Sequence, residues 1–369
     1  MNVLDLESPA FLIDSASLER NARMMLERSS NLGVQLRPHV KTHKSVEVAR
    51  LQLGGGEGAV TVSTLAEARA FFEAGFEDIT YAVPINPHKL ASVLALAEKC
   101  PSFAILLDSE DVADAVERAC KKAGLILSVF LKVDCGYHRA GVDPSSSRSV
   151  SLARRLEESR WIEFKGILTH AGHSYYSHSR AEIKDVAEQE RSRMVEFGKV
   201  LRTSGIACPE ISVGSTPTSV QANHLDGVTE IRPGNYIFFD KFQADIGTCA
   251  YEDCAASVMT RVIGVYPETK RLVIDAGALA LSKDPGAVHV LGETVFGLVL
   301  DDPSLKVVGL SQEHGVVVGE TEERASRIKV GDTLRILPNH SCLAAALHPW
   351  YFVVEGDKVV DRWQPVRGW

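Results

Sequence analysis

A regular alternation of strand-like and helix-like segments is the feature that most restricts how this chain can fold. Short apolar runs suited to strands lie at 10–13, 34–40, 59–62, 79–83, 103–107, 125–133, 164–168 and 211–213. Segments with helical spacing of apolar residues follow most of them, as at 65–74, 109–123, 147–158 and 180–204. Because a strand, a helix and a further strand form a parallel crossover unit, about eight such units in ~240 residues favour a closed (β/α)8 barrel over an open sheet.

The pattern changes in the last third of the chain. After 247, β-rich runs at 257–265, 271–274, 294–300, 307–310, 315–318, 333–337 and 351–354 occur without a convincing long helix. We therefore predict an α/β fold, with a barrel domain over 1–247 and a mainly β domain over 248–369. About the first ten residues are candidates to pack on the β domain.

Composition and charge exclude several classes of function. The net charge of −8 and the isoelectric point of about 5.9 give no electrostatic basis for binding nucleic acid. No apolar run has the length of a membrane span, and the amino terminus lacks the pattern of a signal peptide. The seven cysteines include no CxxC pair, which suits free thiols in a reducing compartment. We expect a cytoplasmic protein with neither nucleic acid nor membrane as a partner.

The basic stretch from Arg37 to Lys44 lies where a predicted strand ends, and barrel enzymes keep their chemistry at the carboxyl ends of strands. Lys41 is surrounded there by Arg37, Lys44 and two histidines. Nearby positive charges should lower the pKa of Lys41, and a neutral amine can form a Schiff base with a carbonyl group. The alternative interpretation of the stretch is a solvated basic turn.

Other polar clusters also follow predicted strands, at Arg139, His170, 214–218 and 232–236. Gly214, Ser215 and Thr216 offer hydroxyl and backbone amide groups that can bind a phosphate, although the same residues also suit a simple turn. A Schiff-base lysine after an early strand and a phosphate loop after a late strand together suggest pyridoxal 5'-phosphate at the mouth of the barrel.

A second kind of site is suggested by His340 and Cys342, which follow the predicted strand 333–337. In extended backbone, side chains two positions apart point the same way, and imidazole with thiolate favours zinc. Taken alone, the pair would more often be a buried histidine beside a buried thiol.

Five motifs, in this order, resemble the D-serine dehydratase and D-threonine aldolase family of alanine racemase-like pyridoxal-phosphate enzymes. They are Arg37 to Lys44, Thr169 to Gly172, Val213 to Thr218, Gln312 to Gly315 and Pro338 to Cys342. The resemblance covers nearly the whole chain. It implies a barrel followed by a β domain, a homodimer, and a divalent metal beside the cofactor.

The resemblance also implies roles for individual residues. Lys41 matches the Schiff-base lysine, Arg139 the arginine at the cofactor's phenolic oxygen, and His170 the histidine on the face of the pyridine ring. Arg232 resembles the arginine that faces the pyridine nitrogen. His340 and Cys342 match the metal ligands, with Zn²⁺ expected and Mn²⁺ or Mg²⁺ as alternatives. The remaining candidate cofactor contacts are Tyr176, Gly214, Ser215, Thr216, Gly234, Asn235 and Tyr236.

The expected activity is elimination of water from a small D-β-hydroxy-amino acid, such as D-serine or D-threo-3-hydroxyaspartate, followed by release of an α-keto acid and ammonia. Cys342 resembles the dehydratase branch, because aldolases of the family tend to carry aspartate at that position. D-Threonine aldolase and amino-acid racemase are the nearest alternatives. A non-catalytic pyridoxal-phosphate carrier and a cofactor-free barrel hydrolase are the more distant ones.

Overall fold

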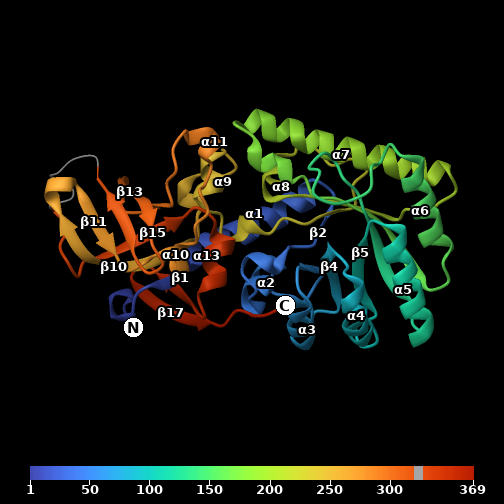
Figure 1. Ribbon diagram of the computed structural model, residues 1–369, viewed down its shortest axis with the longest axis horizontal. Coiled ribbons are helices and arrows are strands. Elements are labelled where there is room, and N and C mark those ends of the chain that lie inside the picture. The colour runs from blue at the N-terminus through green and yellow to red at the C-terminus, as the bar shows by residue number, and fades with distance from the viewer. Residues whose placement is uncertain (320–326) are drawn as a thin grey trace. The chain divides into compact units, whose positions relative to one another are not determined.

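The computed structural model describes residues 1–319 and 327–369, and the chain divides into two compact units. The barrel unit comprises Met24–Gly234 and Val366–Trp369, and the β unit comprises Met1–Arg23 and Asn235–Pro365. Figure 1 colours both units by position along the chain.

The barrel unit is built on a parallel sheet. Among the described residues this sheet has eight strands, in the order β2-β9-β8-β7-β6-β5-β4-β3. Their bounds in that order are Gln35–Leu36, Glu230–Ile231, Glu210–Val213, Ile162–Leu168, Leu127–Lys132, Ser102–Leu107, Asp78–Pro84 and Val60–Val62. The two edges meet through a bridge between His39 and Thr61, where the Thr61 N–H donates to the Pro38 carbonyl at 2.9 Å. The predicted α/β barrel is confirmed.

Helices connect these strands and lie outside them, as α3, α4, α5 and α6 do in Figure 1. The α-helices of the barrel unit are α2 (Val46–Gln52), α3 (Leu65–Glu73), α4 (Leu90–Ala97), α5 (Glu110–Ala123), α6 (Ser147–Glu158), α7 (Arg180–Thr203) and α8 (Thr216–Gln221). The sequence sets the ends of α5 clearly. The Ser109 hydroxyl accepts from the Val112 N–H, and Gly124 ends the helix in the left-handed conformation.

The strands of the barrel unit are apolar because they are enclosed on both sides. All six residues of β6 are buried, and Ala104, Leu106, Phe130 and Leu168 form one core cluster. Parallel strands covered by helices have no solvent face, which explains their nearly continuous apolar sequences.

The β unit is organised around a second sheet. Within the described residues it has nine strands, in the order β11-β14-β13-β12-β15-β10-β1-β16-β17. Their bounds in that order are Arg271–Ile274, Gly315–Val318, Asp302–Leu310, Gly297–Val299, Thr333–Pro338, Ala256–Tyr266, Ala10–Asp14, Tyr351–Glu355 and Lys358–Trp363. Short helices α9 (Lys241–Asp245), α10 (Ala278–Leu281), α11 (Val288–Leu291) and α13 (Ser341–Leu347) accompany the sheet.

The path of the chain differs in detail from the expected division at 247. Strand β1 lies in the sheet of the β unit, paired with β10 and β16, and α1 (Ser15–Asn31) then leads toward the barrel strands. The chain returns to the β unit at Asn235, whose side-chain amide donates to Asp240 and Ser341. The boundary between the two units therefore lies between Gly234 and Asn235, earlier than predicted. The strands on both sides of it have similar apolar sequences, so the sequence pattern does not reveal this boundary.

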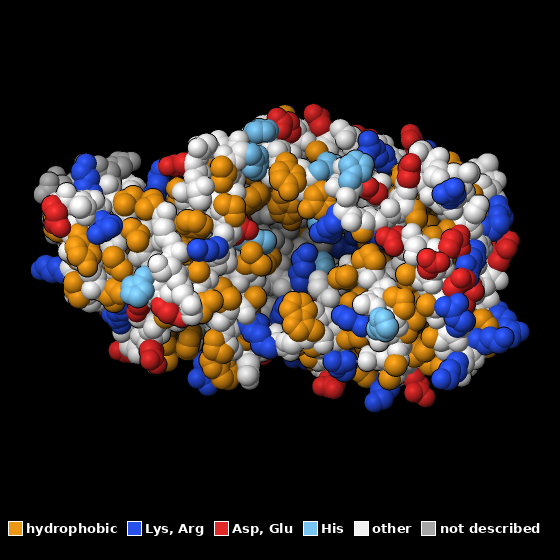
Figure 2. All heavy atoms as spheres, in the orientation of Figure 1, with side chains coloured by type: hydrophobic (Ala, Val, Ile, Leu, Met, Phe, Trp, Pro, Cys, Tyr) orange, Lys and Arg blue, Asp and Glu red, His pale blue; other side chains and the backbone are white. Residues whose placement is uncertain are grey.

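No helix in the described ranges is long and apolar enough to span a membrane. On the face drawn in Figure 2, basic and acidic side chains are interspersed, as the modest net charge leads one to expect.

Candidate active site

Lys41 lies just beyond the end of β2, in the 3-10 turn η2 (Val40–Thr42). Pro38 interrupts the strand because it has no N–H to donate, and His39 caps the turn by accepting from the Lys41 N–H at 3.5 Å. A Cβ at Gly234 would lie 2.6 Å from the His39 carbonyl oxygen, so the two segments need a glycine at this close approach. The Lys41 side chain is exposed within this arrangement.

Several cationic side chains gather around Lys41. Burial lowers the pKa of His170 well below its ordinary value, and the positive charges of Lys41, Lys132 and Arg139 lower it further. Lys132, at the end of β6, is itself buried, and burial followed by the charge of Arg232 lowers its pKa to about 7. Such a concentration of positive charge is costly without an anion to offset it.

His170, just beyond β7, is held as a neutral imidazole. Its Nδ1 lies 3.3 Å from the Gly214 carbonyl oxygen, so Nδ1 carries the proton and Nε2 is left as the basic nitrogen. Tyr137 packs edge-on against this ring, with centroids 6.1 Å apart, and the guanidinium of Arg139 lies 5.1 Å from the centre of the tyrosine ring. The structure therefore places His170 and Arg139 against the same tyrosine ring.

The Gly214–Thr218 segment, which includes the first turn of α8, follows β8 and is organised by a residue that sequence reasoning missed. Glu190, buried on α7, accepts from the Gly214 N–H at 3.0 Å, the Ala171 N–H at 3.1 Å and the Thr218 hydroxyl at 2.9 Å. Burial raises the pKa of Glu190. A single glutamate on a long helix carries no motif, and its alignment with two loops is visible only in three dimensions.

Ser219, the residue of α8 that follows this segment, has an unsatisfied buried oxygen. The Ser219 hydroxyl is buried and has no hydrogen-bond partner among the described residues. It lies beside Gly214, where a Cβ would come within 2.9 Å of it. Gly214 has φ of +116°, so both its conformation and its surroundings require glycine. A buried hydroxyl without a partner is rare, and it is a candidate donor to a ligand.

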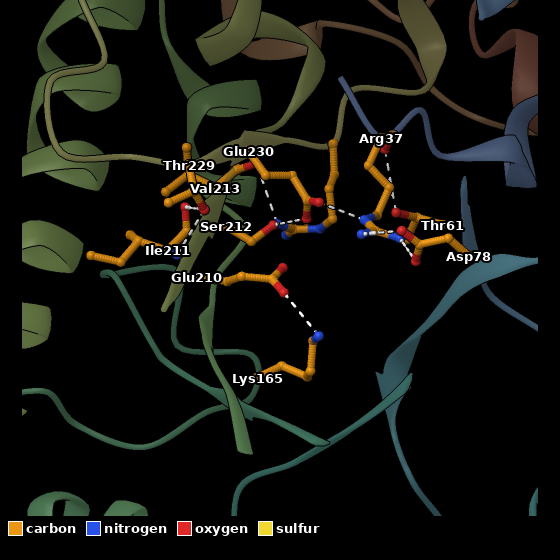
Figure 3. Close-up of polar contacts among 11 residues, drawn as sticks. Arg37, Thr61, Asp78, Lys165, Glu210, Ile211, Ser212, Val213, Thr229 and Glu230 are labelled. Carbon is orange, nitrogen blue, oxygen red and sulfur yellow. Dashed lines mark hydrogen bonds and ion pairs between the residues drawn. The ribbon is translucent and has the colours of Figure 1, made fainter. Parts of the chain in front are cut away.

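Arg232 lies just beyond β9 and is buried. It donates to the Ser212 hydroxyl and to the carbonyl oxygens of Val213 and Thr169. Burial lowers the pKa of Arg232 to about 10, while the charges of Glu230 and Glu190 act in the opposite direction. Figure 3 labels Ser212, Val213 and Glu230 among the polar contacts in this part of the barrel.

In the β unit, His340 and Cys342 lie at the start of α13. His340, the residue before the first turn, has extended backbone, but Cys342 lies within that turn, so the expectation that the extended segment reaches Cys342 was wrong. The helix-favouring run from Leu343 to Leu347 explains why the backbone turns immediately. Burial alone would lower the pKa of His340, but Cys342 and Asp284 raise it well above its ordinary value.

A carboxylate and an amide support this pair. Asp284 Oδ2 lies 3.1 Å from His340 Nδ1, and Asn235 Nδ2 lies 3.6 Å from Cys342 Sγ. Asp240 accepts from the Ser341 N–H at 2.9 Å and so holds the turn between the two side chains. Among the described residues, no group of three or more His, Cys, Asp or Glu side chains is arranged to hold a metal.

The remaining predicted residues occupy different surroundings. Tyr176, at the end of η4 (Gly172–Tyr176), is 65% exposed, whereas Tyr236 is fully buried. Asn235 and Tyr236 belong to the β unit, where the side-chain amide of Asn235 contacts Asp240, Ser341 and Cys342.

Comparison with known proteins assigns the family. Residues 13–241 match the model of the alanine racemase N-terminal domain, and residues 255–354 match that of a putative serine dehydratase domain. The chain belongs to the D-serine dehydratase and D-threonine aldolase family of alanine racemase-like enzymes. The resemblance noted from the five motifs is thus confirmed.

Several members of this family are similar over their whole length. The chain is 39% identical to D-threo-3-hydroxyaspartate dehydratase of Delftia sp., covering 100% of this chain and 99% of that protein. It is 36% identical to D-serine dehydratase of Dictyostelium discoideum, with 100% and 98% covered. D-Threonine aldolase of Arthrobacter sp. is 30% identical, with 97% and 92% covered.

A solved structure extends the likeness to three dimensions. It is a cysteine-to-alanine mutant of D-threo-3-hydroxyaspartate dehydratase in a metal-free form, and it matches with a TM-score of 0.94 and 37% identity over 100% of both chains.

Proposed function

We propose that this chain is a pyridoxal-phosphate-dependent dehydratase of a small D-β-hydroxy-amino acid, with D-serine and D-threo-3-hydroxyaspartate as the leading substrates. The products would be an α-keto acid and ammonia. The whole-length similarity to two dehydratases supports this reaction, since the family member with aldolase activity is less similar.

The observation that carries the cofactor proposal is the cluster of Lys41, Lys132, Arg139 and Arg232 at the carboxyl ends of the barrel strands. An anionic ligand would offset these charges, and the unpartnered Ser219 hydroxyl beside Gly214 offers a donor to a phosphate. The residues present therefore fit pyridoxal phosphate. We propose Lys41 as its covalent attachment point and the Gly214–Thr216 segment as its phosphate contact.

The other proposed residues would contact the remaining parts of the cofactor. Arg139 would bind the phenolic oxygen, His170 would pack on the ring, and Arg232 would face the ring nitrogen. Tyr176 and Gly234 are proposed at the margins of the site. The neutral state of His170 suits ring packing, because an imidazolium would add another positive charge to the cluster.

The donor set at His340 and Cys342 fits a divalent ion, and zinc is the ion that we propose. One imidazole and one thiolate are ligands that zinc accepts, and a ligand set of two leaves positions open for water or a substrate oxygen. Asp284, bonded to the other ring nitrogen of His340, would orient that ring. A cysteine mutant of the solved relative is described in a metal-free form, which supports a metal ion among the relatives of this chain.

Each proposed residue then has a defined task in the reaction. Bound pyridoxal phosphate supplies an electron-withdrawing ring that makes the α-proton of a substrate acidic. Lys41 would remove that proton as a general base. Arg232, Arg139 and His170 would hold and orient the cofactor. A metal ion held by His340 and Cys342 would act as a Lewis acid on the β-hydroxyl group.

Product analysis tests this proposal. Purified protein supplied with pyridoxal phosphate and zinc should release keto acid and ammonia from D-serine, D-threonine or D-threo-3-hydroxyaspartate, and not from the L-enantiomers. Glycine and aldehyde should be measured in the same samples. Predominant release of glycine and aldehyde would instead identify an aldolase, and loss of optical rotation without release of ammonia would identify a racemase.

Homodimer formation and a cytoplasmic location complete the proposal, and both rest on resemblance to the family. Sedimentation equilibrium of the holoenzyme should give twice the chain mass of 40.2 kDa. A measured mass of one chain would refute the homodimer and would leave the proposed reaction unaffected.

A further inference from the structure

A chain of hydrogen-bonded side chains crosses the interior of the barrel unit and ends on Arg232. It begins at Asp78, the first residue of β4, whose side chain is 43% exposed. Arg37 donates to both oxygens of Asp78, with Nη2 to Oδ2 at 3.1 Å, and its Nε donates to Glu230 Oε2 at 2.5 Å. The other oxygen of Glu230 accepts from the Ser212 hydroxyl, which accepts in turn from Arg232. Figure 3 labels Arg37, Asp78, Ser212 and Glu230 in this arrangement.

The directions of these hydrogen bonds are fixed by chemistry. An arginine only donates, so the Ser212 oxygen must accept from Arg232, and its single hydrogen is then directed to Glu230. One carboxylate therefore serves two guanidinium groups, directly for Arg37 and through a hydroxyl for Arg232. Glu230, Arg37 and Arg232 are 1%, 4% and 5% exposed, so water contributes little to this balance.

Stability alone is a poor explanation for such an arrangement. Buried ion pairs seldom stabilise a fold more than apolar side chains of the same volume would, because removing charges from water is costly. A network of this kind is better suited to specifying one geometry. Here the fixed geometry is that of the Arg232 guanidinium, which is also bound to the carbonyl oxygens of Thr169 and Val213 at the ends of β7 and β8.

We infer that Glu230 is a positioning residue that holds Arg232 in place for the ring nitrogen of the cofactor, and that Arg37 contributes by holding Glu230. This inference rests on the proposed function. Burial lowers the pKa of Arg232 to about 10 and Glu230 acts to raise it, so removal of Glu230 makes the charged form of Arg232 less favourable. Glu230 and Arg37 act through Arg232 and need no contact with the cofactor themselves.

The test measures binding of pyridoxal phosphate to apo-protein and the absorption spectrum of the bound cofactor. Glu230→Gln should weaken binding about 10- to 100-fold, the range expected for loss of a charge-assisted hydrogen bond. Its spectrum should shift in the same direction as that of Arg232→Gln, because both variants change the group opposite the ring nitrogen. The double variant should bind no more weakly than Arg232→Gln alone, since Glu230 acts only through Arg232.

A matched control lies on the neighbouring strand. Glu210, the first residue of β8, is paired with Lys165 at 3.4 Å and is drawn apart from the hydrogen-bonded chain in Figure 3. Glu210 interacts with Glu230 and Arg37 through its charge, so Glu210→Gln should change cofactor affinity less than Glu230→Gln does and should leave the spectrum unshifted. The inference would be overturned if the losses of cofactor affinity in the two single variants added fully in the double variant. It would also be overturned if Glu230→Gln had wild-type affinity and spectrum.

A second variant keeps the inference testable if Glu230→Gln fails to fold. Ser212→Ala removes the linking hydroxyl and leaves the contact of Arg37 with Glu230 intact, and it should produce the same spectral shift with a smaller loss of affinity. An unshifted spectrum in a folded Ser212→Ala protein would refute the inference. If the wild type itself does not bind pyridoxal phosphate, the proposed function fails, a result distinct from failure of the positioning role.

Discussion

At the scale of single residues, the structure separates three lysines near the barrel mouth by their surroundings. Lys41 is exposed in a turn, Lys132 is buried at the end of β6, and Lys44 forms an ion pair with Glu67 at 3.0 Å. An amine that attacks a carbonyl must be reachable and close to the other cofactor contacts. Among these three, Lys41 meets both conditions.

Lys41→Ala should abolish the visible absorption band of the bound cofactor and nearly all turnover, because the attachment point and the general base are lost together. Lys44→Ala is the control, and it should retain the band, since that side chain contacts Glu67 and the Trp369 ring. Borohydride reduction followed by peptide mapping provides an independent check. A label on Lys44 or Lys132 would exclude Lys41 as the attachment point.

Lys132 predicts a pH dependence of stability. Burial and then Arg232 lower its pKa to about 7 from an ordinary value of 10.5, so between these two values the unfolded chain binds a proton that the native protein does not. Wild-type stability should therefore rise with pH across this range relative to Lys132→Met, and below about pH 7 the wild type bears the full cost of the buried charge.

Urea unfolding of the two apo-proteins at pH 6 and pH 9 measures this effect. The advantage of Lys132→Met in free energy of unfolding should shrink by a few kcal/mol at the higher pH, since one pKa unit corresponds to about 1.4 kcal/mol. A pH-independent difference would show that Lys132 has the same protonation state in the folded and unfolded chains.

At the scale of elements, Gly166 shows how closely β7 and β8 approach. It has φ of +132°, and a Cβ there would lie 2.1 Å from the Glu210 carbonyl oxygen. Gly166→Ala should therefore lower the free energy of unfolding by about 3 kcal/mol or more, because backbone must move. Gly124→Ala, at the end of α5 with φ of +71° and open space, should cost only about 1 kcal/mol. Equal losses in thermal or urea unfolding would contradict this account.

The sequence predicted the bounds of helices well where the apolar periodicity and a capping residue indicate the same end of the helix. The predicted helices 109–123, 147–158 and 180–204 match α5, α6 and α7 closely, because each has a serine cap and an amphipathic pattern. The strand 34–40 was predicted too long, since the paired residues of β2 are only Gln35 and Leu36. Strand β17 was missed because its side chains are largely exposed and charged, a pattern that does not alternate clearly.

The candidate site was predictable only where its residues form local motifs. Lys41, His170, Gly214, His340 and Cys342 stand in short unusual sequences at strand ends. Glu190, Glu230 and Asp284 do not, and their importance depends on contacts with residues that are 24, 193 and 56 positions away. Composition and periodicity carry no information about such long-range contacts.

At the scale of the whole molecule, the proposed cofactor residues from Lys41 to Arg232 belong to the barrel unit, and the proposed metal ligands belong to the β unit. The two functions should therefore be separable by experiment. Cys342→Ala, or removal of metal with a chelator, should abolish keto-acid formation, while the absorption band of the cofactor and slow exchange of the substrate α-proton with solvent persist.

His340→Ala should behave like Cys342→Ala, and the double variant should cost little more than either, because ligands of one ion act as a unit. Zinc should restore activity to the stripped wild type but not to the variants. Undiminished keto-acid formation by the chelated enzyme, or absence of any divalent metal from the active protein, would refute a metal-assisted elimination.

The position of β1 also determines the order in which a nascent chain can fold on the ribosome. The strands of the barrel sheet have all been synthesised once Ile231 is added, but β1 pairs with β10 around Met259 and with β16 from Tyr351 onward. Phe11, Leu12 and Ile13, which are fully buried in the folded protein, must therefore wait until β10 and then β16 have been synthesised. Until then these residues form an unpaired apolar strand, and such strands are prone to associate with other chains.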